Sequence, residues 1–200
     1  MIPKIIHYCW FGRNQIPSGY QHYINSWKRF LPNYEVKEWN EDNYDVNCIP
    51  FSKEAYEVKK YAYVSDYARL KILYEHGGVY FDTDVEVIKS IDDILANGAW
   101  MGIEKHISAP EADDIVNVGI GFAVEPHHPI IREVMSFYEN THYIFSDGHM
   151  EQIPIVPVVT KVLQKHGMPS KIDKPTNIKG ITIYPCLLYT SPSPRDMRRS

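Results

Sequence analysis

The stretch that decides the fold is Ser65-Asp-Tyr-Ala-Arg-Leu-Lys-Ile-Leu-Tyr-Glu-His-Gly-Gly-Val-Tyr-Phe-Asp-Thr-Asp84. Its first part has a helical pattern, with Ser65 as a predicted N-cap and Gly77-Gly78 as the predicted stop. Three apolar residues, Val79-Tyr-Phe81, then predict a short buried strand that ends on a pair of carboxylates. A helix that leads into such a strand is typical of an α/β fold.

The flanking sequence continues this alternation of strands and helices. Ile2–Cys9 and Tyr34–Trp39 have strand patterns, and Pro17–Leu31 between them has apolar residues at helical spacing. A β-helix-β opening of this kind favours an α/β sheet. Helical character also extends upstream of Ser65 to Ser52, with a predicted break near Tyr63-Val64. Further strands are predicted at 99–103, 116–124 and 181–184, and further helices at 129–138 and 155–165.

Composition excludes several classes of function. The chain has 200 residues and a formal net charge of −4, and its basic residues form no dense stripe before the C-terminus, so nucleic-acid binding is not expected. No apolar run approaches the ~20 residues of a membrane-spanning helix. Three cysteines without C-x-x-C spacing argue against a disulfide framework and a zinc site. We expect a soluble protein of the reducing cytoplasm, and peripheral association with the inner face of the membrane stays open.

Asp82 and Asp84 are the candidate metal ligands. On an extended backbone, residues i and i+2 project to the same side, so both carboxylates can reach one cation. Ligation by oxygen alone suits Mg²⁺ or Mn²⁺, with water and substrate phosphates completing the coordination. Two acidic residues at this spacing are also common in solvated loops, so the D-x-D pair by itself leaves both interpretations open.

Asp66 and Arg69 are one helical turn apart and share a face. They could form a capping residue and a surface ion pair, or they could bind sugar hydroxyls and phosphate oxygens through the carboxylate and the guanidinium. Gly77-Gly78 has two interpretations as well, a helix stop or a place where the backbone approaches a ligand closely. His127-His128 before Pro129 is expected to be a loop or a cap.

Two ordered motifs give the chain a family resemblance. Ser65–Val85 and the opening Ile2-Pro-Lys-Ile-Ile-His-Tyr-Cys-Trp-Phe-Gly12 together resemble the signature of the DXD sugar transferases of glycosyltransferase family 32. That family includes fungal initiating mannosyltransferases and bacterial capsular transferases. Asn117–Pro129 also resembles the family's segment after the metal site, so the resemblance covers roughly residues 1–185.

The resemblance implies a GT-A fold, a Rossmann-like mixed sheet flanked by helices that binds a nucleotide-sugar with Mn²⁺ or Mg²⁺. It implies retaining transfer of a hexose, with a UDP-sugar as the better guess for the donor, to a polysaccharide or glycolipid acceptor. No enzymic nucleophile is evident. The implied roles are nucleobase contacts for Cys9 and Trp10, donor contacts for Asp66, Arg69, Tyr80 and Asp82, metal ligation for Asp84 with Asp82, and catalysis by Asp82, Asp84 and Arg69.

Two points of this assignment stay open on the residues alone. Trp10 can stack on a base, because an exposed aromatic face adds ~1–3 kcal/mol per stacked base, or it can be a core residue at a strand end. The family closes its site with a later segment that contains a His and a Ser-Trp pair, whereas Cys186 onward matches nothing. We therefore expect a glycosyltransferase domain over 1–186 that is incomplete at its C-terminus, and an unpacked, non-native tail over 187–200.

Two further functions follow from these observations. The missing segment is compatible with a catalytically impaired remnant that binds nucleotide-sugars without turnover. A metal-dependent phosphodiester hydrolase is a weaker alternative, because a two-metal site needs more acidic or His ligands than the sequence offers.

Overall fold

The computed structural model describes residues 1–104, 112–185 and 190–191. Its helices are α1 (Ser18–Phe30), α2 (Pro50–Glu57), α3 (Tyr61–His76), α4 (Asp92–Ala96), α5 (Pro129–Glu139) and α6 (Ile155–Lys165). Its strands are β1 (Ile5–Cys9), β2 (Glu35–Trp39), β3 (Gly78–Tyr80), β4 (Glu86–Val87), β5 (Trp100–Glu104), β6 (Ile115–Val116), β7 (Phe122–Val124), β8 (Thr176–Ile178), β9 (Ile181–Tyr184) and β10 (Thr190–Ser191).

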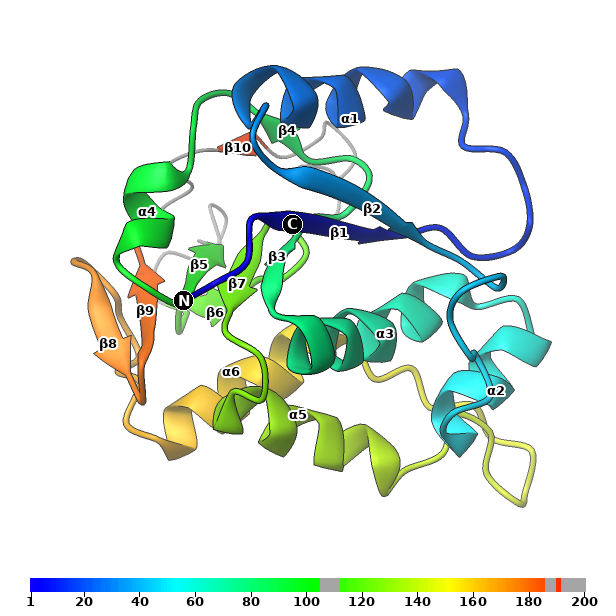
Figure 1. The fold of residues 1–200 in the computed structure, drawn as a ribbon. Helices are drawn as coiled ribbons and strands as arrows, with labels where there is room; N and C mark the ends of the chain where they lie inside the picture. The colour runs from blue at the N-terminus through cyan, green and yellow to red at the C-terminus, as the bar shows by residue number, and fades with distance from the viewer. Residues whose placement is uncertain (105–111, 186–189, 192–200) are drawn as a thin grey trace.

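A mixed sheet runs through the molecule in the order β2-β1-β3-β7-β5-β9-β8, with β6 beside β5 (Figure 1). Strand β1 is parallel to both β2 and β3, β7 is antiparallel to β3 and β5, and β9 is parallel to β5. Helix α1 lies on one side of this sheet, and α3, α5 and α6 lie on the other. The α/β class and the mixed, helix-flanked sheet predicted from the sequence are confirmed.

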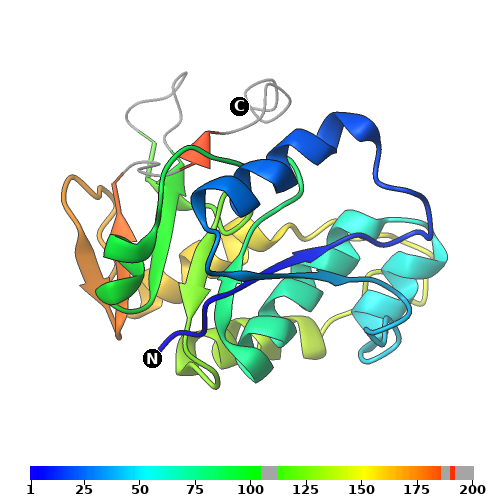
Figure 2. The same cartoon turned by 45° about the horizontal axis from the view of Figure 1, so that its top comes forward.

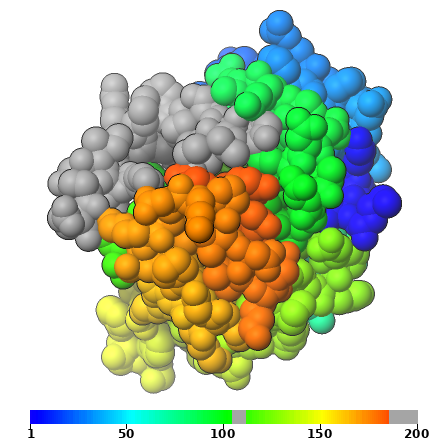
Figure 3. Space-filling view, turned by 90° about the vertical axis from the view of Figure 1, so that its left-hand side faces the viewer, coloured from blue at the N-terminus to red at the C-terminus, as the bar shows by residue number. Residues whose placement is uncertain are grey.

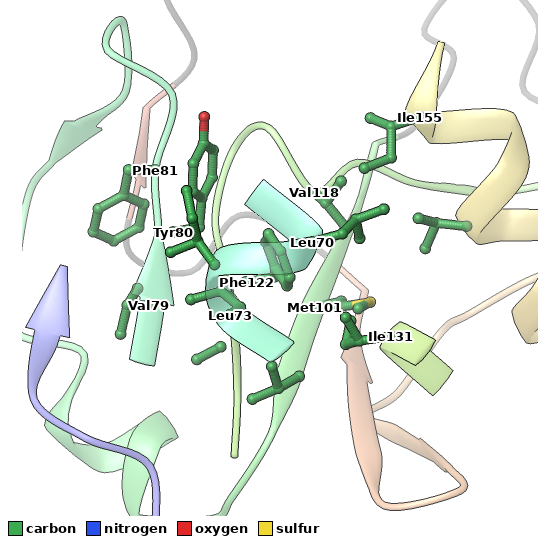
Figure 4. Packing of buried hydrophobic residues seen from close by; sticks show 14 of the residues in the cluster. Leu70, Leu73, Val79, Tyr80, Phe81, Met101, Val118, Phe122, Ile131 and Ile155 are labelled. Carbon is green, nitrogen blue, oxygen red and sulfur yellow. The ribbon is translucent and has the colours of Figure 1, made fainter. Parts of the chain in front are cut away.

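Helix α3 is buried around most of its circumference because it packs between the sheet and the pair α5 and α6 (Figure 1). Figure 4 shows Leu70 and Leu73 of this helix gathered with Phe122 of β7 and Met101 of β5. Burial of one Leu or Phe side chain stabilises a fold by ~1.5–3 kcal/mol. The same packing carries the polar residues of α3 into the interior.

The predicted start of α3 was wrong. The break in the helical stretch falls at Val58–Lys60, where Lys59 has a φ of 59°, and α3 begins at Tyr61. Ser65 therefore lies inside the helix, and its hydroxyl donates to the Tyr61 carbonyl at 3.1 Å instead of capping the N-terminus. A serine within a helix can satisfy its hydroxyl in this way, so the residue type alone did not locate the cap.

The two glycines after α3 act as a helix stop and as a strand contact. Gly77 adopts a φ of 65° and its N–H donates to the Leu73 carbonyl at 2.8 Å. A Cβ on Gly78 would lie 2.7 Å from the Ile5 carbonyl oxygen, so the missing side chain lets β3 lie against β1. The helix-stop interpretation is confirmed, and the close approach at Gly78 is to the chain's own backbone.

Helix α1 forms hydrogen bonds with the segment that follows the D-x-D pair. This segment lies beside α1 in both ribbon views (Figures 1 and 2). The Trp27 indole N–H donates to the Val85 carbonyl at 2.8 Å. The Val87 backbone N–H donates to the Ser26 hydroxyl at 2.9 Å. These bonds fix where the chain runs after Asp84.

Strands β8 and β9 complete one end of the sheet, and the orange residues of the C-terminal part of the chain lie in the middle of the face shown in Figure 3. Strand β9 matches its predicted range, whereas β8 was not predicted, because Thr-Asn-Ile has too few apolar residues to stand out. Lys179 and Gly180 between them have φ values of 50° and 94°, as a two-residue hairpin turn requires.

Two further predictions concern His128 and the C-terminal tail. The imidazole of His128 caps α5 by accepting from the Ile130 N–H at 3.3 Å, as expected. Thr190–Ser191 pair antiparallel with β4, and the rest of the predicted tail lies outside the described residues. Over the residues that the structure describes, none of the helices has the length and apolar character needed to cross a membrane.

Candidate active site

The predicted site residues gather at one edge of the sheet. Trp10 directly follows β1, and Asp82 follows β3 by two residues. Because β1 and β3 are parallel, their carboxyl ends meet at the same edge, where open α/β sheets bind ligands. Helix α3 supplies Asp66 and Arg69 to this region from one face of the sheet.

Arg69 is the centre of the site. Its side chain is 5% exposed, and Nη1 contacts Asp82 Oδ2 while Nη2 contacts Asp66 Oδ1, each at 3.1 Å. The third nitrogen, Nε, donates to the Ser65 carbonyl at 3.1 Å. The guanidinium also lies 4.7 Å from the centroid of the Tyr80 ring. One buried cation therefore orients two carboxylates and packs on an aromatic face.

Asp66 is an internal residue. It is 8% exposed, and its Oδ2 accepts the N–H of Ile155, the first residue of α6, at 3.2 Å. Burial raises the pKa of Asp66 to about 7, with Asp82 adding to the rise and Arg69 opposing it. The surface-pair interpretation of Asp66 and Arg69 is wrong, because α3 is enclosed by α5, α6 and the sheet.

Asp82 faces both the protein interior and solvent. Its Oδ1 accepts from the Tyr80 hydroxyl at 3.2 Å, its Oδ2 from Arg69, and its side chain is 36% exposed. Tyr80 itself is 1% exposed. Figure 4 shows its hydroxyl at the outer end of a ring that begins among the core residues. The Asp82 carboxylate is thus held by Tyr80 and Arg69, and part of it remains accessible to solvent.

The D-x-D pair does not lie on an extended strand. The Val85 N–H donates to the Asp82 carbonyl at 3.1 Å, which closes a turn around Thr83 and Asp84. The extended backbone predicted for the pair was therefore wrong, because the chain turns here to run beside α1. Asp84 lies in that turn and is partly exposed.

The two carboxylates fit a hard divalent cation. Throughout the described ranges, no cluster of three or more His, Cys, Asp or Glu side chains could by itself hold a metal. Asp82 and Asp84 are both oxygen donors and both reach the surface. A donor set of one or two carboxylates suits Mg²⁺ or Mn²⁺, which keep water and phosphate oxygens as their remaining ligands.

Trp10 is partly exposed and oriented by its neighbours. Its backbone N–H donates to the Trp39 carbonyl at 2.8 Å, and its indole N–H to the Asn14 carbonyl at 2.7 Å. The Tyr20 ring centroid lies 5.8 Å from that of Trp10. Trp10 is therefore not a core residue, and an indole with a fixed orientation is suited to stacking on a planar ring.

Cys9 does not offer a reactive thiol. The residue is 7% exposed within β1. Burial raises the pKa of its thiol to about 12, although Arg69 and Tyr80 counteract that rise. A thiol of this kind stays protonated and inert at neutral pH.

One part of the site was not predicted as such, the loop Asn117–Gly121 between β6 and β7. The Gly119 carbonyl accepts the Asp82 N–H at 3.0 Å, and a Cβ on Gly119 would lie 2.4 Å from Asp82 Oδ2. Only a glycine lets the loop lie this close to the carboxylate. The strand predicted over 116–124 is interrupted here, because β6 ends at Val116 and β7 begins at Phe122. The sequence signals of a site were the resemblance of Asn117–Pro129 to the family's segment after the metal site and the polar Asn-x-Gly that opens it.

Comparisons with known proteins agree with this geometry. A family model described as a glycosyltransferase sugar-binding region containing the DXD motif matches residues 17–100. That range contains Asp66, Arg69, Tyr80, Asp82 and Asp84, whereas Trp10 lies before it.

Two relatives at modest sequence identity are named as glycosyl- or mannosyltransferases. The chain is 27% identical, over 67% of its length, to inositol phosphoceramide mannosyltransferase 1 of Schizosaccharomyces pombe, and it covers 42% of that protein. It is 29% identical, over 94% of its length, to the uncharacterized glycosyltransferase L373 of Acanthamoeba polyphaga mimivirus, of which it covers 75%. The chain thus spans less than half of the length of the mannosyltransferase.

A solved structure shares the fold. PaToxG glycosyltransferase superimposes with a TM-score of 0.60 at 19% identity, over 82% of this chain and 69% of the other. The likeness confirms the GT-A fold that the two motifs implied. The chain is therefore similar, over residues 17–100, to glycosyltransferase sugar-binding regions that contain the DXD motif, and it has a GT-A fold.

Proposed function

We propose that this chain carries a metal-dependent, retaining glycosyltransferase site that moves a hexose from a nucleoside-diphosphate sugar, a UDP-sugar, to a glycolipid or polysaccharide acceptor. The observation that carries the proposal is the buried Arg69, which holds Asp66 and Asp82 at the carboxyl edge of the sheet. A built-in arrangement of this kind costs little reorganisation when a substrate binds.

Each residue has a role that follows from its surroundings. Trp10 offers an oriented aromatic face for the nucleobase. Asp82 presents its exposed side to hydroxyls of the donor sugar while Arg69 and Tyr80 hold its two oxygens. Asp84, with Asp82, would hold Mg²⁺ or Mn²⁺, and the bound ion would supply stabilisation of the negative charge on the departing diphosphate.

The acceptor and the place of reaction belong to the proposal as well. The name of the Schizosaccharomyces pombe relative makes inositol phosphoceramide its acceptor, which supports a glycolipid here. Cys9 and Cys48 are free, which is consistent with a reducing compartment. We place the reaction in the cytoplasm, with the lipid acceptor presented at the inner face of a membrane.

The test is a thermal-shift and turnover screen of UDP-glucose, UDP-galactose and GDP-mannose, with Mn²⁺, Mg²⁺ or EDTA. We expect a metal-dependent rise in melting temperature with at least one donor, because a bound ligand stabilises by RT ln(1 + [L]/Kd). Asp84→Asn should abolish that rise, and Asp93→Asn on the exposed face of α4 should leave it unchanged. Metal-dependent turnover that persists in Asp84→Asn would refute the metal assignment.

A second candidate is a nucleotide-sugar-binding remnant without turnover. It is favoured by the sequence from Cys186 onward, which does not match the family's pattern. Donor binding without release of UDP or GDP would support it. Appending a family-like segment with a His and a Ser-Trp pair after Pro185 should then restore turnover, whereas turnover by the unaltered chain would eliminate this candidate.

A further inference from the structure

Glu104 ends β5, the strand that runs on the far side of β7 from β3. Nothing in the sequence motifs gave it a role. In the structure its Oε2 accepts from the Asn117 side-chain amide at 2.8 Å. This contact connects the end of β5 to the loop that lies against the D-x-D turn.

The contact with Glu104 decides which way the Asn117 amide points. A carboxylate only accepts hydrogen bonds, so it must face the NH₂ group and not the carbonyl of the amide. The amide oxygen is then turned toward Gly119, whose N–H donates to it at 2.8 Å. The reversed amide would set oxygen against carboxylate and NH₂ against N–H, and both contacts would be lost.

The Asn117 backbone anchors the same arrangement. Its N–H donates to the Gly102 carbonyl of β5 at 3.1 Å. The side chain is thus fixed at both ends, by β5 through the backbone and by Glu104 through the amide. Only the orientation of the amide group depends on Glu104.

The Asn117–Gly121 loop contacts Asp82 through Gly119. The Gly119 carbonyl accepts the Asp82 N–H at 3.0 Å, and the Cα hydrogen side of Gly119 faces Asp82 Oδ2, where a Cβ would come within 2.4 Å. Arg69 Nη1 lies 3.5 Å from the same Cβ position. Gly119 therefore packs against the ion pair of Arg69 and Asp82.

We propose that Glu104 is a positioning residue of the donor site, which acts through Asn117 and Gly119 to fix the backbone and carboxylate of Asp82. The proposal rests on the proposed function. Arg69 and Tyr80 hold the Asp82 carboxylate from the core, and Gly119 packs against it. Glu104 touches neither donor nor metal, and its effect comes from the orientation of one amide.

The activity test compares Glu104→Leu, which removes the acceptor, with Glu104→Gln, which keeps an acceptor oxygen. For Glu104→Leu we expect donor hydrolysis or transfer to fall about 30-fold in kcat, since misplacement of a contact by 1 Å can cost ~10²-fold. The affinity for UDP measured in EDTA should change little, because UDP without a metal ion lacks both groups that Asp82 contacts in the proposed function. Glu104→Gln should restore the rate to within about threefold of the unaltered chain. Glu35→Leu, at an exposed position on β2, is the matched control.

A second measurement keeps the inference independent of activity. Hydrogen exchange of the Asp82 and Gly119 backbone amides should quicken at least about tenfold in Glu104→Leu, while the melting temperature stays close to that of Glu35→Leu. Unchanged exchange, or equal loss of UDP affinity and rate, would overturn the positioning role. If exchange quickens but the unaltered chain binds no donor with any metal, the proposed function fails and the link from Glu104 to Asp82 stands.

Discussion

At the scale of single residues, Arg69 shows why residue type and burial together determine the site. Its planar group reaches Asp66 and Asp82 at once, so two carboxylates are compensated by one cation inside the protein. Sequence reasoning found these three residues through their spacing and through the family motif. It could not show that the pair is buried. Charged residues usually face solvent, whereas Asp66 and Arg69 of α3 face the core.

We predict that Arg69→Met lowers the free energy of unfolding by ~3–5 kcal/mol, because it leaves the buried carboxylate of Asp66 and the partly exposed one of Asp82 without a cation. Arg132→Met is the matched control: Arg132 pairs with Glu139 at 2.7 Å, but its side chain is 45% exposed. An exposed pair contributes ~0–1 kcal/mol. Urea unfolding at neutral pH measures both, and equal losses would contradict the account of Arg69.

Two fully buried tyrosines give a second prediction at this scale. The Tyr143 hydroxyl has no hydrogen-bond partner among the described residues, whereas the Tyr138 hydroxyl donates to the Ile153 carbonyl at 3.3 Å. A buried hydroxyl without a partner costs ~1–3 kcal/mol. Tyr143→Phe should therefore raise the midpoint of urea unfolding and Tyr138→Phe should lower it. A fall of the midpoint in Tyr143→Phe would refute this interpretation.

At the scale of elements, His7 ties three of them together. The Trp39 indole N–H of β2 donates to His7 Nδ1 at 3.0 Å, so the proton of the neutral ring is on Nε2, which donates to the Gly77 carbonyl at the end of α3, also at 3.0 Å. The pKa of His7 is lowered to about 4, mainly by burial, with the electrostatic effects of His76 and Lys37 adding to the fall and the bond to Gly77 opposing it. A second proton on the ring would break the bond to Trp39.

This link predicts a loss of stability in mild acid. The pKa of His7 is about 6.5 in the unfolded chain and about 4 in the folded one, so its contribution is complete above pH 6.5 and is lost as the pH falls toward 4. Between pH 7 and pH 5 the loss should be about 2 kcal/mol.

Urea unfolding at the two pH values measures this loss. His7→Gln, which cannot gain the proton, should be less stable at pH 7 and should lose about 2 kcal/mol less between the two pH values. His22→Gln on the exposed side of α1 should behave as the unaltered chain does. A His7→Gln profile parallel to that of the unaltered chain would exclude His7 as the cause.

The elements also show where sequence patterns stop being informative. Helices α5 and α6 and strand β9 were predicted within one residue, because their apolar periodicity agrees with their burial. The start of α3 and the turn at the D-x-D pair were not, because both depend on contacts with distant segments. The turn exists because α1 fixes Val85 and Val87, and no local signal reports those bonds.

At the scale of the whole molecule, the sheet depends on its last two strands. Strand β9 lies between β5 and β8, and three isoleucines of this hairpin, Ile178, Ile181 and Ile183, are at most 5% exposed. Each contributes ~1.5–3 kcal/mol of burial, and together they match most of the 5–15 kcal/mol by which a typical domain is stable.

Two shortened chains test this dependence. A chain of residues 1–185 should keep cooperative thermal unfolding with a melting temperature within about 5 °C of the unaltered chain, since a loss of ~1 kcal/mol shifts the midpoint by a few degrees. A chain of residues 1–174 should not unfold cooperatively, because it lacks β8 and β9 and leaves β5 as an open edge. A cooperative transition in the shorter chain would show that the sheet does not need this hairpin.

The fold and the similarity to DXD glycosyltransferases were predictable at this scale from two motifs at the beginning and the middle of the chain. The connection from Glu104 through Asn117 to Asp82 was not, because it joins residues whose separation in sequence says nothing about their contact. Its details depend on the antiparallel β7, which brings the Asn117–Gly121 loop back beside β3.

The pairing of β5 with β9 also bears on the order in which the protein acquires its structure during synthesis. Trp100 of β5 lies opposite Thr182 of β9. More than eighty further residues must therefore be translated after β5 before β9, its neighbour in the sheet, exists. Nascent chains with such late partners expose apolar edges for longer and are prone to aggregate. Until then, α1, α3 and the first three strands can assemble on the ribosome, which makes the half of the sheet that bears Asp82 the older part of every newly made molecule.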